Sequence, residues 1–270
     1  MQSIEVKNGI NGYQLKLIGA ALMVLDHIHQ MFYWAGDLTI LNMLGRSVLP
    51  IFLFMCAEGF HYTRSRFNYG KRLFLCAILM PLASQFIMQV FPIDEPSVVL
   101  MNNVFATMFI AVICMYGIEK FKNKEFLKGI VLFLLPVIPA LLLTALIDTN
   151  NIMLLRIIML IPSYLTAEGG ILMIVLALWF YVFREKRLWQ YLGIIAVAIA
   201  SALSYPDFTW QSLIEGSNYQ WMMIGAIIPL YFYNGQRGKG SKYFFYIFYP
   251  SHIYALYLLA FMSLKMGLFN

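Results

Sequence analysis

Charged residues are scarce in this chain. Asp, Glu, Lys and Arg together make up 12% of the sequence, whereas about 25% is usual for soluble globular domains. Cysteine is rare too, and the spacing of Cys56, Cys76 and Cys114 matches neither a disulfide framework nor a zinc-ligand pattern. These shortages exclude an ordinary soluble domain, and they give no reason to expect a metal site.

Apolar residues dominate instead. They make up 61% of the 270 residues and form runs of roughly 17–25 residues, each long enough to cross a bilayer as a helix. Backbone groups in lipid must be hydrogen-bonded within the span, which favours helices. The sequence therefore predicts an all-α fold, a polytopic transmembrane helix bundle that forms a single domain over residues 1–270. Nine helices are predicted, at residues 13–34, 42–63, 70–91, 101–119, 127–147, 167–184, 188–205, 218–234 and 242–265.

A tenth helix is an open alternative. The segment "NIMLLRIIMLIPSYL", residues 151–165, is apolar but short, contains Arg156 and breaks at Pro162. Such a segment is typical of a broken or re-entrant helix. The prediction is therefore a bundle of nine or ten helices.

The basic residues predict the orientation. Short cytoplasmic loops of membrane proteins are enriched in Lys and Arg. In a nine-helix arrangement with a cytoplasmic N-terminus, all of the 19 basic residues except Arg46, Arg156 and Lys265 fall on the cytoplasmic side. The net charge of +6 follows from this bias and requires no nucleic-acid partner. We expect a multi-pass protein of the plasma (inner) membrane, in contact with the lipid bilayer.

Ionisable residues interrupt the first predicted helix in the stretch "VLDHIHQMF", residues 24–32. Such groups are costly in a membrane unless they face a partner or a polar cavity, so Asp26, His27 and His29 are functional candidates. Asp26 and His29 share a helix face, whereas His27 points about 100° away. One interpretation makes a histidine the general base and Asp26 the group that orients it. The alternative is an ion-paired cluster with Arg46 that only locks the first two helices together.

A basic segment, "EGFHYTRSRFNYGKR" at residues 58–72, lies at the cytoplasmic end of the second predicted helix. Its guanidinium and ammonium groups suit a phosphate, and its hydroxyls add further contacts. The alternative is an ordinary positive-inside loop, but an acid and a histidine three residues apart within the span favour a binding site. The candidate binding residues are Glu58, His61, Thr63, Arg64, Arg66, Tyr69 and Arg72.

A third polar feature is "YIFYPSHIY", residues 246–254, early in the last predicted helix. Pro250 removes one helical hydrogen bond and clashes with the carbonyl four residues earlier, so the backbone there is expected to be irregular. Irregular backbone at membrane depth is tolerated beside a polar cavity. The alternative is a purely structural histidine, but the position of His252 near the middle of the membrane favours a functional one.

Together these segments resemble the TraX family of membrane proteins, named for the pilin N-acetyltransferase of conjugative plasmids. The resemblance runs along "LKLIGAALMVLDHIHQMF", "LGRSVLPIFLFMCAEGFHYTRSRFNYGKRL" and "FYPSHIY". It covers the first third and the last helix, and the middle only in helix count and hydropathy. The family motifs fall on Asp26 and His27, Gly45 and Arg46, Glu58 and Gly59, Thr63 and Arg64, Tyr69, Arg72 and Leu73, and Tyr249, Pro250 and His252.

The resemblance implies a membrane acyltransferase that moves an acetyl group from acetyl-CoA to an amine or hydroxyl acceptor, on a peptide such as the pilin N-terminus or on a surface glycan. In that interpretation His27 deprotonates the acceptor, with Asp26 in support, and Arg46 stabilises the oxyanion. The phosphates of acetyl-CoA lie on the basic segment. A tunnel lined by His252 and Glu58 connects the two places.

The sequence leaves the acceptor and two other functions open. The chain has "SYLTAEGG" at residues 163–170 where the family tends to have an Asp-Tyr-Gly-like stretch, so acceptor recognition can differ. A proton-coupled transporter is the main alternative function, because buried Asp and His residues also build proton relays. A structural assembly subunit is a third, although it leaves the intramembrane charges unexplained. The sequence does not specify the acceptor, N- or O-acetylation, or the oligomeric state.

Overall fold

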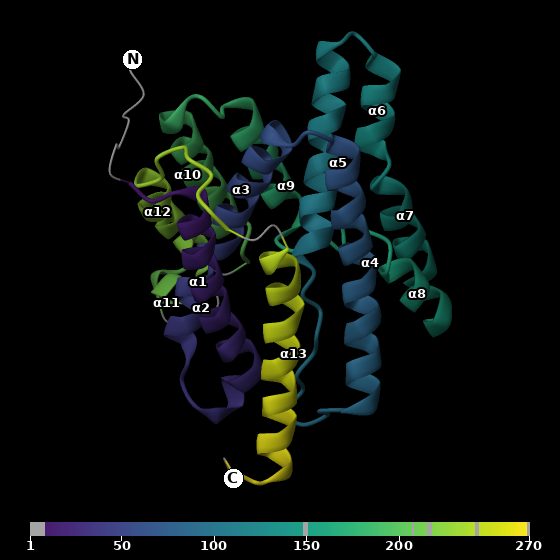
Figure 1. Ribbon diagram of the computed structural model, residues 1–270. Coiled ribbons are helices and arrows are strands. Elements are labelled where there is room, and N and C mark those ends of the chain that lie inside the picture. The colour runs from purple at the N-terminus through teal and green to yellow at the C-terminus, as the bar shows by residue number, and fades with distance from the viewer. Residues whose placement is uncertain (1–8, 148–150, 207, 215–217, 241–242, 269–270) are drawn as a thin grey trace. The chain divides into compact units, whose positions relative to one another are not determined.

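The computed structural model describes residues 9–147, 151–206, 208–214, 218–240 and 243–268. Within these ranges the chain is all-α, as predicted, and its one β feature is an isolated bridge between Ile10 and Tyr233. Two basic residues of the orientation argument, Lys7 and Lys242, lie outside the described residues, as do the acidic residues Asp148, Asp207 and Glu215. The helices in chain order (Figure 1) are α1 (Gly12–Phe32), η1 (Tyr33–Ala35), α2 (Thr39–Gly45), α3 (Val48–Tyr62), α4 (Arg66–Val90), α5 (Val104–Lys122), α6 (Phe126–Leu134), α7 (Val137–Leu146), α8 (Ile152–Met159), α9 (Gly170–Val182), α10 (Arg187–Leu203), α11 (Trp210–Ile214), η3 (Gln220–Ala226), α12 (Ile227–Tyr231) and α13 (Phe244–Lys265).

Five helical segments among the described residues are long and apolar enough to cross a membrane. They confirm a polytopic helical membrane protein, whereas the count of nine or ten spans and the cytoplasmic N-terminus stay predictions. Helix α1 has 21 residues, but its polar positions set it apart from these five. The five are Thr39–Tyr62, Arg66–Val90, Val104–Lys122, Phe126–Leu146 and Phe244–Lys265, and three shorter apolar helices are Gly170–Val182, Arg187–Leu203 and Gln220–Tyr231.

Several predicted spans are interrupted. The span predicted at 42–63 is two helices, α2 and α3, which are separated by Arg46 and Ser47. The span predicted at 127–147 divides at Pro136, whose missing N–H and fixed φ suit the residue that precedes α7. The segment predicted at 218–234 begins as the 3-10 helix η3, and the open tenth segment forms the short helix α8.

The expectation of irregular backbone around Pro250 is wrong. Helix α13 is continuous from Phe244 to Lys265, with Pro250 inside it (Figure 1). Pro250 lies in the second turn, where the loss of one backbone hydrogen bond does not end the helix. His252 therefore projects from regular helix, and its Nδ1 bonds back to the carbonyl of Phe248 within the same helix.

The residues form two compact units. The first contains Met1–Met55, Phe86–Val99 and Glu185–Asn270. Within it α1 packs along α13 and against α2, and α10 packs against η3 (Figure 1). Leu15, Ile51 and Ile253 are fully buried in its core.

The second unit contains Cys56–Gln85 and Leu100–Arg184. Its central helix is α5, which packs against both α6 and α9. Ile110 and Cys114 of α5 are buried together with Ile174 of α9. In contrast, most apolar side chains of α6 and α7 are exposed, as expected for helices that face lipid. The single domain expected over residues 1–270 stays a prediction.

The connection between α5 and α6 is closed by an ion-paired glutamate. Hydrogen bonds from Lys120, at 2.8 Å, and from Lys128 lower the pKa of Glu125 to about 2 from an ordinary value of 4.5. Because the folded pKa is lower, this pairing stabilises the connection above about pH 4.5 and is lost as the pH falls toward 2.

We therefore expect Glu125→Gln to remove part of the acid sensitivity of this connection. Hydrogen exchange of its backbone amides, compared between pH 5 and pH 3, measures the effect. Glu95 lies in a loop and forms no ion pair with any described residue, so Glu95→Gln is the control variant and should leave that sensitivity in place. An equal acid response in wild type and Glu125→Gln would contradict the prediction.

Candidate functional site

Helix α1 is positioned in the first unit by its N-terminus. Asn11 Oδ1 accepts hydrogen bonds from the amides of Tyr13 and Gln14, both at 3.0 Å, and Gln14 Oε1 accepts one from the Asn11 amide. This reciprocal capping satisfies amides that the helix leaves free. The Ile10 amide also donates to the Phe232 carbonyl at 2.8 Å, which ties the start of α1 to the end of α12. The start of α1 is therefore held both by its own cap and by a distant segment of the first unit.

His27 pairs with His252. His27 is 2% exposed, and its Nδ1 lies 2.7 Å from Nε2 of His252 on α13. The two rings are stacked with 4.9 Å between centroids, and the edge of Tyr249 lies near both. His252 Nδ1 in turn lies 2.8 Å from the Phe248 carbonyl oxygen. A chain of hydrogen bonds thus joins α1 to α13 through two imidazoles.

The Phe248 carbonyl determines which nitrogens carry hydrogen. A carbonyl oxygen only accepts, so His252 donates to it from Nδ1, and in a neutral ring Nε2 is then an acceptor. His27 therefore donates from Nδ1 to His252, and its own lone pair lies on Nε2. This tautomer makes Nε2 of His27 the basic nitrogen. After it takes up a proton, the imidazolium keeps its hydrogen bond to His252.

Asp26 pairs with Arg46, and its support of His27 stays a prediction. Arg46 Nη2 donates to Asp26 Oδ1 at 2.6 Å, and the two side chains are 26% and 21% exposed. Arg46 also donates from Nη1 to Gln220 Oε1 and from Nε to the Asn42 carbonyl, both at 3.2 Å. The ion pair expected between Asp26 and Arg46 is present, and the oxyanion role of Arg46 stays a prediction. Nδ1 of the third residue, His29, is buried without a hydrogen-bond partner among the described residues.

Gly45 lets α2 approach this ion pair closely. A Cβ added at Gly45 would lie 2.4 Å from both Cβ and Oδ1 of Asp26. Real Cβ atoms do not make contacts this short, so any larger residue must displace Asp26 or the helix. Gly45 therefore leaves space for Asp26, and Arg46 supplies the charge that pairs with it.

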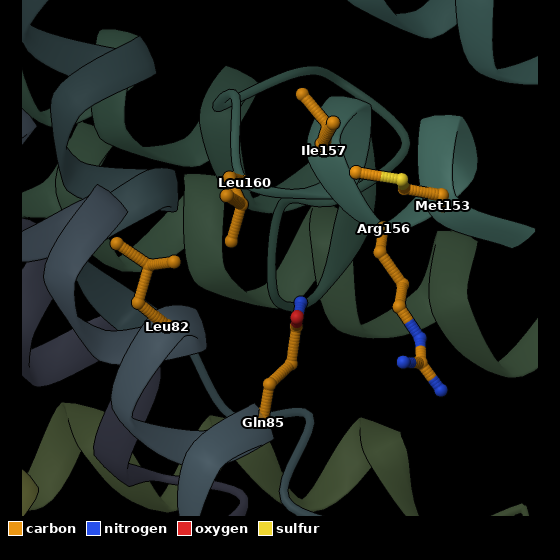
Figure 2. A pocket seen from close by; sticks show the side chains of 6 residues that line it. All are labelled: Leu82, Gln85, Met153, Arg156, Ile157 and Leu160. Atoms are coloured by element: carbon orange, nitrogen blue, oxygen red, sulfur yellow. The ribbon is translucent and has the colours of Figure 1, made fainter.

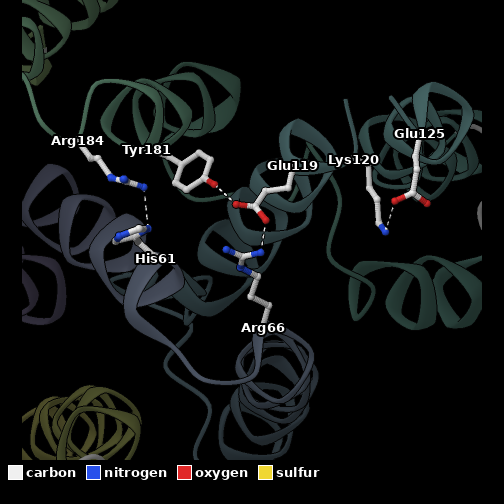
Figure 3. Close-up of polar contacts among 7 residues, drawn as sticks. All are labelled: His61, Arg66, Glu119, Lys120, Glu125, Tyr181 and Arg184. Carbon is white, nitrogen blue, oxygen red and sulfur yellow. Dashed lines mark hydrogen bonds and ion pairs between the residues drawn. The ribbon is translucent and has the colours of Figure 1, made fainter. Parts of the chain in front are cut away.

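The basic segment of the second unit is partly neutralised within the protein (Figure 3). Arg66 forms an ion pair with Glu119 of α5, and the Tyr181 hydroxyl donates to the same carboxylate. The Arg66 guanidinium also lies 5.0 Å from the ring centre of Phe60. These contacts hold Arg66 against α5 and α9, which leaves less of its charge for an external phosphate than the sequence suggested.

His61 also has an internal partner. Its Nδ1 lies 2.7 Å from Nη1 of Arg184 (Figure 3), and because an arginine only donates, His61 accepts this bond. Thr63 donates to the Ser65 carbonyl at 3.3 Å, so it shapes the turn between α3 and α4. Glu58 lies one turn before His61 on α3 and is partly buried.

Two arginines of the segment keep their charge available. Arg64 is exposed, and Nε of Arg72 is buried without a hydrogen-bond partner among the described residues. The Arg72 guanidinium lies 5.9 Å from the ring centre of Tyr69, whose hydroxyl donates to Cys56 Sγ at 3.4 Å. A guanidinium that keeps a buried donor without a partner among the described residues is suited to bind an anionic group such as a phosphate.

Several partners in the site were not predicted from the sequence. Glu119 is the clearest, since an acid in the last turn of an apolar span is itself a signal. Tyr181, Arg184 and Gln220 gave no such signal, because their importance depends on contacts between distant segments. Within the described ranges, no group of three or more His, Cys, Asp and Glu side chains is placed to hold a metal ion.

Known proteins resemble the chain over most of its length. The family profile described as "TraX protein" matches residues 11–260. The chain belongs to the TraX family. This TraX-family chain is also 25% identical to a probable fimbrial assembly protein, FimC of serogroup H1 from Dichelobacter nodosus, over 253 residues that cover 90% of this chain and 93% of the relative. No solved structure matches it. The resemblance inferred from the sequence motifs is therefore confirmed, and it extends through the middle of the chain.

Proposed function

We propose that this TraX-family protein is a membrane-embedded acetyltransferase that moves an acetyl group from acetyl-CoA to an amine or hydroxyl acceptor. The observation that carries the proposal is the hydrogen-bonded chain from His27 through His252 to the Phe248 carbonyl. It gives a buried imidazole a defined basic nitrogen and a partner that supports its protonated form. General acid–base catalysis of acyl transfer needs a base of this kind.

Acetyl-CoA would supply the acetyl group as a thioester. Nε2 of His27 accepts the proton of the acceptor while the acceptor nitrogen or oxygen bonds to the acetyl carbon. His27 then returns that proton to the sulfur as the carbon–sulfur bond breaks, so the products are the acetylated acceptor and free coenzyme A. His252 keeps the ring of His27 oriented throughout, and Asp26 with Arg46 holds α2 against α1.

The second unit offers residues for the phosphates of coenzyme A. Arg64 and Arg72 are the best placed, because neither is engaged in an ion pair with a described residue. Arg66 contributes less, since Glu119 already neutralises it. Tyr69 supports the Arg72 side chain through its ring. The proposed anion site therefore rests mainly on Arg64 and Arg72, which are fewer residues than the whole basic segment.

The acceptor is proposed from the relatives. The TraX family is known for pilin acetylation, and the similar protein from Dichelobacter nodosus is named a fimbrial assembly protein. These names favour the N-terminal amine of a pilus subunit as the acceptor.

Acetyl-CoA turnover by the purified full-length protein tests the proposal. Thiol release is measured with acetyl-CoA alone and with a peptide that carries a free N-terminal amine, and thermal unfolding is followed with and without coenzyme A. We expect thiol release that rises with the peptide, and a higher unfolding temperature with coenzyme A. If neither thiol release nor stabilisation is observed, the proposal is overturned. A proton-coupled transporter, in which the histidine pair serves as a proton relay, is then the better interpretation.

Arg72→Gln is expected to weaken coenzyme A binding about tenfold, since a hydrogen bond to a charged group contributes about 1.5 kcal/mol or more. Titration calorimetry with coenzyme A measures the change. Lys124→Gln, which removes a positive charge from the α5–α6 connection, should bind as wild type does. Equal losses of coenzyme A affinity in both variants would contradict a specific role for Arg72, because binding would then depend only on the net positive charge of this part of the protein.

A further inference from the structure

Arg156 is a charged residue in an apolar helix, and the proposed acetyl transfer gives it no role. It lies in α8, where Met153 and Ile157 are exposed apolar neighbours. It forms no ion pair with any described residue. In the predicted orientation it is also one of the three basic residues outside the cytoplasmic set. The positive-inside bias therefore does not account for it, and an exposed arginine among apolar side chains is suited to an anionic partner.

Arg156 lines a cavity within the second unit, between α4 and α8 (Figure 2). The cavity has a volume of about 480 Å³. Gln85 extends from α4 toward α8, whereas Arg156 extends its guanidinium away from its own helix. The remaining walls are aliphatic, so the cavity combines two polar groups with an apolar surface. Its lining residues are Leu82, Gln85, Met153, Arg156, Ile157 and Leu160.

We propose that this cavity binds an anionic phospholipid of the bilayer. The guanidinium of Arg156 pairs with the headgroup phosphate, and the amide of Gln85 donates a further hydrogen bond. An acyl chain lies along Leu82, Ile157 and Leu160. The exposed side chain of Leu79, one turn before Leu82 on α4, continues this apolar track beyond the cavity.

The apolar lining selects a lipid over a free phosphate. A free phosphate is strongly hydrated and would gain one guanidinium while it lost water against aliphatic walls. A phospholipid places its phosphate on the same guanidinium and buries hydrocarbon on those walls. The site is independent of the proposed acetyl transfer, since neither the histidine pair nor the basic segment contributes to it.

Native mass spectrometry of the full-length protein in detergent tests the site. The probes are phosphatidylglycerol and phosphatidylcholine with identical acyl chains, and inorganic phosphate as a competitor. We expect wild type to retain phosphatidylglycerol in preference, and Arg156→Gln to weaken that binding roughly fivefold, the equivalent of the ~1 kcal/mol that one basic residue contributes near anionic lipid. Lys265→Gln, which removes a basic residue from the same predicted side, should bind as wild type does.

A second variant keeps the charge and fills the space. Leu82→Trp is expected to lower phosphatidylglycerol binding by a similar factor while Arg156 is retained, and it carries the test if Arg156→Gln does not fold. Several results would overturn the proposal: no lipid preference in wild type, equal losses in Arg156→Gln and Lys265→Gln, or displacement of the lipid by millimolar inorganic phosphate. Unfolding temperatures of the variants show that each remains folded.

Discussion

Replacing His27 with alanine is expected to lower acetyl transfer by about 10²–10⁴-fold, the usual contribution of general acid–base catalysis. The reason is that Nε2 of His27 is the basic nitrogen at the buried end of the histidine chain. Thiol release from acetyl-CoA in the presence of the amine peptide measures the loss. Imidazole added to His27→Ala should restore part of the activity, because it can occupy the space of the missing ring and accept the proton.

His252 is expected to act by positioning His27. His252→Gln can still accept a hydrogen bond from His27 Nδ1 and donate one to the Phe248 carbonyl, whereas His252→Ala can do neither. We expect about 10–100-fold loss in the alanine variant and a much smaller loss in the glutamine variant. An equal, large loss in both would assign His252 a proton-transfer role instead.

One outcome would remove His27 from the mechanism. His27→Ala protein that is folded and transfers acetyl at the wild-type rate is incompatible with a general base at this position. The monodispersity and unfolding temperature of the purified variant separate a loss of chemistry from a loss of fold. Coenzyme A binding should be unchanged in His27→Ala, since the candidate phosphate contacts are on other residues.

Local hydropathy predicted much of the fold, because a membrane span depends on a run of neighbouring side chains. Each predicted span contains a helix, and an apolar run of this length is a strong signal. The positions at which these spans are interrupted were harder to predict. The division between α2 and α3 lies just before Pro50, which cannot donate a helical hydrogen bond to the carbonyl of Arg46, whereas the packing of Gly45 and Arg46 against α1 is encoded by no local pattern.

In the candidate site, too, individual residues were predicted from the local sequence, whereas contacts between distant segments were not. His27 and His252 were each recognised as polar residues in apolar helices, but their pairing joins positions 225 residues apart. Asp26 and His27 are adjacent and point in different directions on the helix, and the ion pair of Asp26 is with Arg46. In the basic segment, charge alone could not show that Glu119 already neutralises Arg66.

Breaking the Asp26–Arg46 pair is expected to have the largest effect on stability. Arg46→Gln or Asp26→Asn leaves the other charge partly buried without its counter-ion, and we expect each to cost about 3 kcal/mol in the free energy of unfolding. That value is the lower end for buried pairs, because the two side chains retain 26% and 21% exposure. Unfolding in detergent, followed by tryptophan fluorescence, measures the change.

The double variant separates the pair from the individual side chains. If the two charges stabilise the protein mainly by neutralising each other, Asp26→Asn combined with Arg46→Gln will cost clearly less than the sum of the single variants. Gly45→Ala retains both charges but places a methyl group where Asp26 lies, and overpacking of this kind costs about 1–3 kcal/mol. Additive single effects, together with a neutral Gly45→Ala, would contradict this account, since the fit of α2 to α1 would then depend on neither the charge pair nor the missing side chain.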